Sequence, residues 1–378
     1  MADLTALADQ LNQTASTGTD AQLRQLLCET PVSPPHGQVR DVTVRKSVPA
    51  LAKGVAPPGA FGKAKISGVL QRIVFIKFRP VTTNIDGQEG ALTFDVKTAG
   101  ELTTNASRNG WIACWFLPWK SGLLVKMDIE PDSGPINSGD PAIAALPNPR
   151  LFYTAAINGC SVFAYGTATG PTVVHAGFET NFADKGKVDQ LGGNSAAMWK
   201  SLLEGVTASP DGLTLTVKPP SKPNLGEVNR YDYIRTRTAD GSDPLGTADA
   251  AQLEQYLKTN RTDVLKVKEV NPWGSVFGLR TGNSWQMTLQ RNVSIQYRTI
   301  RQTSGFLGLG KKDVDIGPAV QKASTKGLDA FNKKRIETNY KHALATNQFV
   351  CCVNVGHTDF FPGAQQISNH AHNQIQFW

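Results

Sequence analysis

Apolar residues cluster in short runs from about residue 66 onward, and these runs are rich in β-branched and aromatic side chains. The runs are VLQRIVFIKF (69–78), ALTFDV (91–96), WIACWFL (111–117), LLVKMDI (123–129), LFYTAAI (151–157), CSVFAYG (160–166) and PTVVHAG (171–177). Clusters of Gly, Asp, Asn and Pro separate them, a pattern typical of antiparallel strands. We therefore predict a β-rich domain in this part of the chain.

The second half of the chain adds further strands and some helices. WGSVFGLR (273–280) and NSWQMTLQ (283–290) flank a short turn and predict a hairpin. The strand-like run VSIQYRTI (293–300) follows, and QFVCCVNV (348–355) predicts a last strand. Capping residues and apolar spacing predict helices at 193–205, 248–258 and 317–346. The predicted fold of residues 66–378 is α+β: an antiparallel β-rich core of sandwich-like mixed sheets with peripheral helices.

Residues 1–65 differ in composition from the rest of the chain. Two short polar amphipathic stretches, near 3–13 and 20–28, precede the Pro/Gly-rich segments PVSPPHGQ and VAPPGAFG. This composition predicts a polar N-terminal arm or linker. Such an arm would be a delivery or chaperone-binding segment, or a plain disordered extension.

Composition narrows the class of protein. With 40% hydrophobic and 19% charged residues, the chain is typical of soluble globular proteins. No apolar run approaches the roughly 20 residues that a membrane span requires, and the Met1 end lacks the apolar region of a Sec signal. The formal charge of +8 favours acidic partners, but the basic residues are scattered and match no nucleic-acid module. We expect neither a membrane span nor nucleic-acid binding.

Cysteine and histidine positions argue against disulfides and metal. The five cysteines are Cys28, Cys114, Cys160, Cys351 and Cys352. Their odd number and irregular spacing suit a reducing compartment. His357, His370 and His372 follow the last two cysteines, but without the paired spacing of a zinc site. We expect no metal and no cofactor.

One predicted hairpin has Cys160 near its start and His175 near its end, in the stretch INGCSVFAYGTATGPTVVHAG (157–177). A four-residue loop at 166–169 would pair Tyr165 with Gly170, and the same register would place Cys160 directly opposite His175. Directly opposed Cβ atoms lie about 4.5–5.5 Å apart on one face of a sheet. The hairpin therefore predicts a Cys–His pair, although a buried thiol and a hydrogen-bonded imidazole are the alternative.

The pair has the chemistry of a nucleophile and its acid/base. A neighbouring imidazolium stabilises a thiolate and can later protonate a leaving amine, so Cys160 would be the nucleophile and His175 the acid/base. Gly159, directly before Cys160, would let substrate approach closely and leave the Cys160 amide to bind a developing oxyanion.

The same residues carry a resemblance to a known family. Asn158-Gly159-Cys160-Ser161, followed fifteen residues after the cysteine by His175-Ala176-Gly177, resembles the catalytic domain of the cytotoxic necrotizing factors. These bacterial toxins deamidate, and sometimes transglutaminate, a glutamine of Rho-family GTPases. The family usually has Ser where this chain has Asn158.

The resemblance implies a Cys160–His175 site on a β-sandwich-like domain, acting on a host protein. In the family, the group that orients the histidine comes from an upstream strand and is largely backbone. The resemblance therefore assigns this role to no side chain of this sequence. Asp128 and Asn158 are our candidates for a polar group that orients His175.

The leading hypothesis is a bacterial effector or toxin that is a cysteine-dependent glutamine deamidase or transglutaminase, working through a thioester. It would be secreted without a Sec signal, with the help of a secretion chaperone or delivery partner, and would act in the target-cell cytosol. A papain-like cysteine protease and a non-enzymatic binding protein are the alternatives. Access to the thiol would separate deamidation from proteolysis, and the sequence does not show it.

Overall fold

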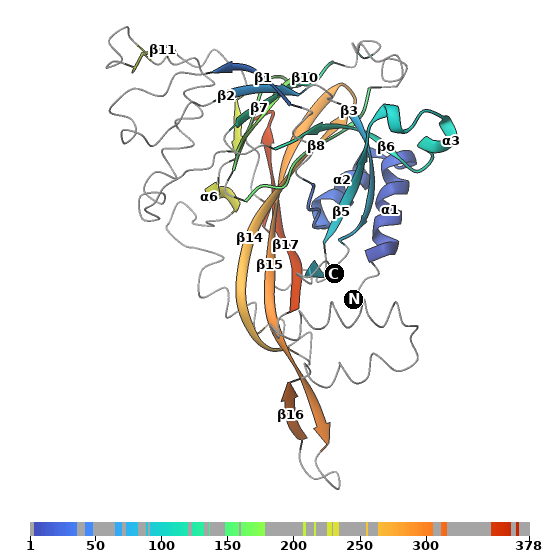
Figure 1. The fold of residues 1–378 in the computed structure, drawn as a ribbon, viewed down its shortest axis with the longest axis vertical. Helices are drawn as coiled ribbons and strands as arrows, with labels where there is room; N and C mark the ends of the chain where they lie inside the picture. Colours follow the sequence, from blue (N-terminus) through green and yellow to red (C-terminus); the bar gives the residue numbers. More distant parts are fainter. Residues whose placement is uncertain are drawn as a thin grey trace.

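Two β-sheets pack face to face, and two helices cover the outer face of the larger sheet (Figure 1). The computed structural model describes residues 4–35, 42–47, 65–69, 73–81, 88–89, 91–119, 123–131, 136, 148–158, 160–177, 207–208, 215–216, 225–228, 230–233, 255, 264–304, 311–315, 349–363 and 368–369. Within these residues the strands dominate, so the predicted α+β fold with a β-rich core is confirmed.

The larger sheet has ten strands. Along its main path the order is β18 (Ser368–Asn369), β17 (Phe349–Phe361), β15 (Ser284–Ser304), β14 (Val264–Thr281), β8 (Leu151–Thr154), β6 (Ile112–Leu117), β3 (Ile73–Pro80) and β5 (Leu92–Lys97). Off this path, β16 (Lys311–Asp315) pairs with β15 and β4 (Gln88–Glu89) pairs with β17. The pairs β6–β8 and β4–β17 are parallel and the others antiparallel, so the sheet is mixed.

The smaller sheet has six strands. Its order is β1 (Val42–Ser47), β2 (Lys65–Val69), β7 (Leu123–Asp128), β10 (Gly170–Gly177), β9 (Ser161–Thr167) and β13 (Gly226–Val228). Among the strands that the structure describes in this sheet, β2 and β7 form the single parallel pair. A separate pair, β11 (Thr207–Ala208) with β12 (Leu215–Thr216), completes the described strands.

Strands of the larger sheet alternate their side chains between two cores. On β3, Phe75 faces the smaller sheet, whereas Ile76 faces the helices. On β8, Phe152 and Tyr153 divide in the same way. This is the period-2 geometry of a strand that is buried on both faces, and it explains why the runs read as continuously apolar.

The helical layer consists of α1 (Leu4–Thr17) and α2 (Asp20–Glu29), and the other helical pieces among the described residues are single turns. These are η2 (Ala99–Glu101), α3 (Asn105–Arg108) and α6 (Arg230–Tyr233). Leu11, Leu23 and Leu27 are fully buried against Phe78 and Tyr153 of the larger sheet. None of the described helices combines the length and apolar character that crossing a membrane demands.

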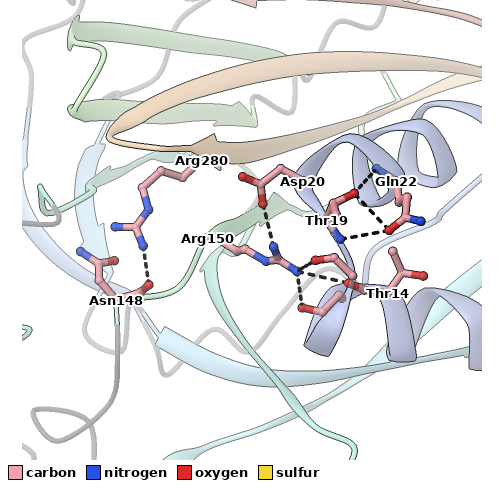
Figure 2. A network of polar contacts seen from close by, with 9 residues as sticks. Thr14, Thr19, Asp20, Gln22, Asn148, Arg150 and Arg280 are labelled. Carbon is pink, nitrogen blue, oxygen red and sulfur yellow. Dashed lines mark hydrogen bonds and ion pairs between the residues drawn. The ribbon is translucent and has the colours of Figure 1, made fainter.

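Two arginines fasten the helical layer to the sheet. Arg150 donates to Oδ1 of Asp20 at 2.7 Å and to the carbonyls of Thr14, Ala15 and Gly18 at 3.0–3.2 Å, so one guanidinium joins the end of α1 to the start of α2 (Figure 2). Thr19 begins α2 with a capping box to Gln22 (Figure 2). On the other side of the layer, Arg24 forms an ion pair with Asp359 of β17, in which Nη2 donates to both carboxylate oxygens at 2.9 and 2.7 Å.

The structure differs here from the predicted N-terminal arm. Residues 4–35 belong to the same body as the sheets, because the leucines of both helices complete a core with β3, β6, β8 and β14. The polar character of the two stretches belongs to their outer faces, where Asp9, Gln10 and Gln13 are exposed.

Most predicted strands occur where the apolar runs placed them. The hairpin of β14 and β15 turns through Gly282, whose φ of 59° is one that glycine adopts readily. β14 (Val264–Thr281) begins nine residues before the predicted range, and β15 (Ser284–Ser304) joins the runs predicted at 283–290 and 293–300 into one strand. The helices predicted at 193–205 and 317–346 lie outside the described residues, as does all but Gln255 of the helix predicted at 248–258.

Candidate active site

The hairpin of Cys160 and His175 exists, but its register differs from the prediction. β9 and β10 are joined by a two-residue turn, Ala168-Thr169, and the first pair is Thr167 with Gly170. His175 therefore lies opposite Val162, and the predicted direct opposition of Cys160 and His175 is wrong. Gly166 takes a φ of 99° inside β9, so a residue that the turn signal assigned to the loop belongs to the strand.

The correction is a shift of two residues, which preserves the face of each side chain. Val162 and Val173 line the core between the sheets, and half-buried Cys160 packs against that same core. His175 has the same strand parity as Val173 and is fully buried. The thiol and the imidazole thus belong to the inward face of one hairpin, offset along it.

Packing of the larger sheet against the hairpin supplies a partner for His175. Thr154 ends β8 and, two residues after Phe152, faces the core between the sheets. Its Oγ1 lies 2.7 Å from His175 Nδ1 and donates to the Leu117 carbonyl at 2.9 Å. A hydroxyl has one proton to donate, and Leu117 receives it.

This arrangement selects a histidine tautomer. We assign the Thr154 proton to the Leu117 carbonyl, so that His175 Nδ1 donates to Oγ1 and the lone pair of the neutral imidazole is on Nε2. An imidazole with Nδ1 protonated and Nε2 basic is the form that accepts a proton from a nucleophile. Thr154 therefore makes the contact with His175 for which Asp128 and Asn158 were candidates.

Cys160 is held through its backbone and its thiol. The Tyr233 hydroxyl, from α6, donates to the Cys160 carbonyl at 2.6 Å. Burial raises the pKa of the Cys160 thiol to about 11, while hydrogen bonds from the Trp119 side chain and the Asn158 backbone act in the opposite direction. The thiol is therefore protonated at neutral pH, so the predicted thiolate–imidazolium pair is not preformed in this arrangement.

The remaining predicted site residues are less closely placed. Asp128 pairs with Thr172 on β10 and lies on the outer face of β7, where its Oδ1 accepts from Thr172 Oγ1 at 2.6 Å and lies 3.1 Å from Lys126 Nζ. The structure does not bring Asp128 to His175. Asn158 is exposed and contributes its backbone to the thiol, and Gly159 lies outside the described residues.

Cys160 differs from the other cysteines whose side chains the structure describes. Cys28, Cys114 and Cys352 are buried, with exposures of 5% or less, whereas Cys160 is half-buried. Burial also raises the pKa of Cys28 to about 12 and that of Cys352 to about 11. Within the described ranges, no three His, Cys, Asp or Glu side chains gather into a metal-binding group.

Three of these residues escaped the sequence analysis: Thr154, Trp119 and Tyr233. Thr154 lies in the run LFYTAAI, where a threonine is an ordinary strand residue, and its contact with His175 depends on packing between two sheets. A parity count from Phe152 would have placed Thr154 on an inward face, but no local pattern identifies its partner.

Neither family models nor curated protein sequences match this chain.

Proposed function

We propose that the chain is a cysteine-dependent amidohydrolase that converts a glutamine side chain of a protein substrate to glutamate. The observation that carries the proposal is the hydrogen bond between Thr154 and His175, which fixes a basic Nε2 on the hairpin face that also presents Cys160. The resemblance of residues 158–161 and 175–177 to the cytotoxic necrotizing factors supports carboxamide chemistry in particular.

The reaction uses the chain's own residues alone. As the Cys160 sulfur bonds to the carboxamide carbon, its proton passes to His175 Nε2, and the carbonyl oxygen becomes an oxyanion. The C–N bond then breaks, the nitrogen takes the proton from His175, and ammonia leaves a thioester. Water hydrolyses the thioester to glutamate, whereas an amine in place of water gives transglutamination.

The raised pKa of Cys160 assigns His175 the role of a general base. A thiol with a pKa of about 11 has few thiolate ions at neutral pH, so proton removal accompanies attack instead of preceding it. Movement of the thiol toward Nε2 as substrate displaces water would lower that pKa, since an imidazolium stabilises the thiolate.

The substrate and setting of the proposal come from the family resemblance. We propose that the substrate is a host protein, and small GTPases of the Rho family are the first to test. The chain would be delivered as a bacterial effector and would act in the cytosol of the target cell. The net charge of +8 suits a substrate with an acidic surface around the glutamine.

The test incubates small GTPases with the wild-type chain, with Cys160→Ser and with Cys28→Ser as a matched control, because Cys28 is buried and distant in sequence from the hairpin. Wild type and Cys28→Ser should release ammonia and convert one Gln to Glu in an intact substrate, as read by peptide mass spectrometry. Cys160→Ser should do neither.

Two other outcomes separate the alternatives. Cleaved substrate would identify a cysteine protease. Iodoacetamide labelling of the chain itself needs no substrate: if Cys160 reacts no faster than Cys28 and Cys160→Ser keeps every effect on cells, the chain is a binding protein and the proposal fails.

A further inference from the structure

Tyr233 makes a contact with the proposed nucleophile that the proposed reaction does not use. Its ring is fully buried in the core between the sheets, and its hydroxyl donates to the Cys160 carbonyl at 2.6 Å. The carbonyl belongs to the peptide that links Cys160 to Ser161, the first residue of β9. A short hydrogen bond to this carbonyl restricts rotation of the peptide beside the nucleophile.

The segment that carries Tyr233 is fastened to both sheets. β13 pairs with β9, with Val228 opposite Val162 and Gly226 opposite Ala164. On its other side, Gly226 lies so close to the Phe360 carbonyl of β17 that a Cβ at this position would collide with it. Tyr233 follows this strand by five residues, so its place depends on the pairing with β9 and on the packing against β17.

A charge interaction adds a second restraint on the same turn. Asp232, next to Tyr233, interacts electrostatically with Arg291 of β15, a residue only 8% exposed. The turn that carries Tyr233 is therefore connected to β9 and β17 by packing and pairing and to β15 by charge. Such a rigid donor aimed at the backbone of a reactive residue is a means of preorganisation.

We propose that Tyr233 is a positioning residue for the nucleophile: by holding the Cys160 carbonyl, it keeps the backbone of Cys160 oriented so that the amide can stabilise the oxyanion. The hydrogen bond also directs the negative end of the Cys160–Ser161 peptide dipole toward the Tyr233 hydroxyl. The inference rests on the proposed function and assigns a residue to it that does not touch the substrate.

The test compares two reactions of the same thiol. With p-nitrophenyl acetate, the Cys160 sulfur bonds to the ester carbonyl carbon, passes its proton to His175 and expels p-nitrophenolate through a tetrahedral oxyanion. With iodoacetamide, the sulfur displaces iodide from a saturated carbon, and no oxyanion forms. A residue that acts on the oxyanion site affects acylation and spares alkylation.

Tyr233→Phe removes the hydroxyl and keeps the ring. Acetylation of Cys160, followed as p-nitrophenolate release and confirmed by peptide mass spectrometry, should slow by about three- to tenfold, in line with the loss of one hydrogen bond. Alkylation of Cys160 should keep its wild-type rate.

Two control variants separate positioning from mere packing. Tyr153→Phe also removes a hydroxyl from a fully buried ring, but one with no hydrogen-bond partner among the described residues, and it should change neither rate. Val228→Ala opens a cavity in β13 and retains the Tyr233 hydroxyl. It should leave the ratio of acylation to alkylation at the wild-type value even where it lowers stability.

The inference is overturned if Tyr233→Phe keeps the wild-type ratio, or if Val228→Ala lowers the ratio by as much. Failure of the proposed function looks different: wild-type Cys160 would then show no acetylation above the buried cysteines, and both ideas would fall together.

Discussion

Thr154 makes two hydrogen bonds with a single hydroxyl, and both belong to the candidate site. Thr154→Val has nearly the same shape but cannot accept from His175 Nδ1, so the imidazole loses the partner that fixes its tautomer. We expect acylation of Cys160 by p-nitrophenyl acetate to fall by about ten- to a hundredfold. Thr154→Ser, which retains the hydroxyl, should restore most of the rate.

Thr30 provides the matched control for this change. It is also a buried threonine, but its Oγ1 has no hydrogen-bond partner within the described parts of the chain. Thr30→Val should therefore keep the wild-type acylation rate and be neutral or stabilising in urea unfolding. Equal rates for wild type and Thr154→Val would contradict the orienting role.

At the scale of residues, the sequence identified the two side chains of the hairpin but not their geometry. The Gly and Thr residues around Ala168 predict a turn, yet both a four-residue and a two-residue loop fit them. The observed turn is also held by a tertiary contact, because the backbone N–H of Trp285, on a distant strand, donates to the Ala168 carbonyl at 2.7 Å. Thr154 and Tyr233 reach the site through tertiary packing, which local spacing does not encode.

Among the elements, the junction of α1 and α2 depends on one guanidinium. Arg150→Lys keeps a positive charge but loses the planar fork that reaches Asp20 and three carbonyls at once. The carbonyls at the end of α1 would then lose a donor, and Asp20 at the start of α2 would lose its ion pair. We expect the free energy of unfolding, measured in urea, to fall by about 1–3 kcal/mol.

Arg79→Lys is the comparison for Arg150→Lys. Arg79 pairs with Asp95 across β3 and β5, but the two side chains are 40% and 53% exposed. A solvent-exposed ion pair contributes about 0–1 kcal/mol, so this variant should unfold nearly as wild type does. If Arg150→Lys lowered the free energy of unfolding as little as Arg79→Lys does, the charge of Arg150 alone would account for its contribution.

Element prediction succeeded where apolar residues recur without interruption. The runs that became β6 and β8 are buried on both faces, so every residue carried the signal. The first part of β14 was missed because Lys, Glu and Asn interrupt the apolar pattern there, while backbone pairing continues from Thr281–Ser284 to Val264–Thr299.

At the scale of the molecule, the helical layer and the two sheets form adjoining cores that share the larger sheet. Leu11→Asp places a carboxylate at a position with 0% exposure and should lower the free energy of unfolding by more than about 3 kcal/mol. Two signals report the unfolding: helical circular dichroism, and the fluorescence of Trp115 and Trp285 in the core between the sheets. The urea midpoints of both signals should fall by the same amount.

Gln10→Asp, one residue away on the exposed face of α1, tests the specificity of that effect. It should change stability by less than about 0.5 kcal/mol. If the helical signal of Leu11→Asp melted alone while the tryptophan signal kept its wild-type midpoint, the helices would be a separable arm after all.

Composition misled the interpretation of this part of the molecule. The segment 1–65 is polar overall, and an average over it hides the leucines that recur on one face of α1 and α2. The fold class was predictable because it depends on the many short strands, whereas the place of the helices depends on a sheet face that needed cover.

Thr154, Cys160 and His175 occupy one short stretch between residues 154 and 175, and the rest of the chain supplies the support around it. Because the three residues of the proposed site are so close in sequence, a single short gene segment could carry all of them. A brief deletion would remove it together with β9 and most of β10, two inner strands of the smaller sheet. One recombination event could move it to another scaffold with a compatible pair of sheets. Descent of the site and descent of the body could therefore follow different histories.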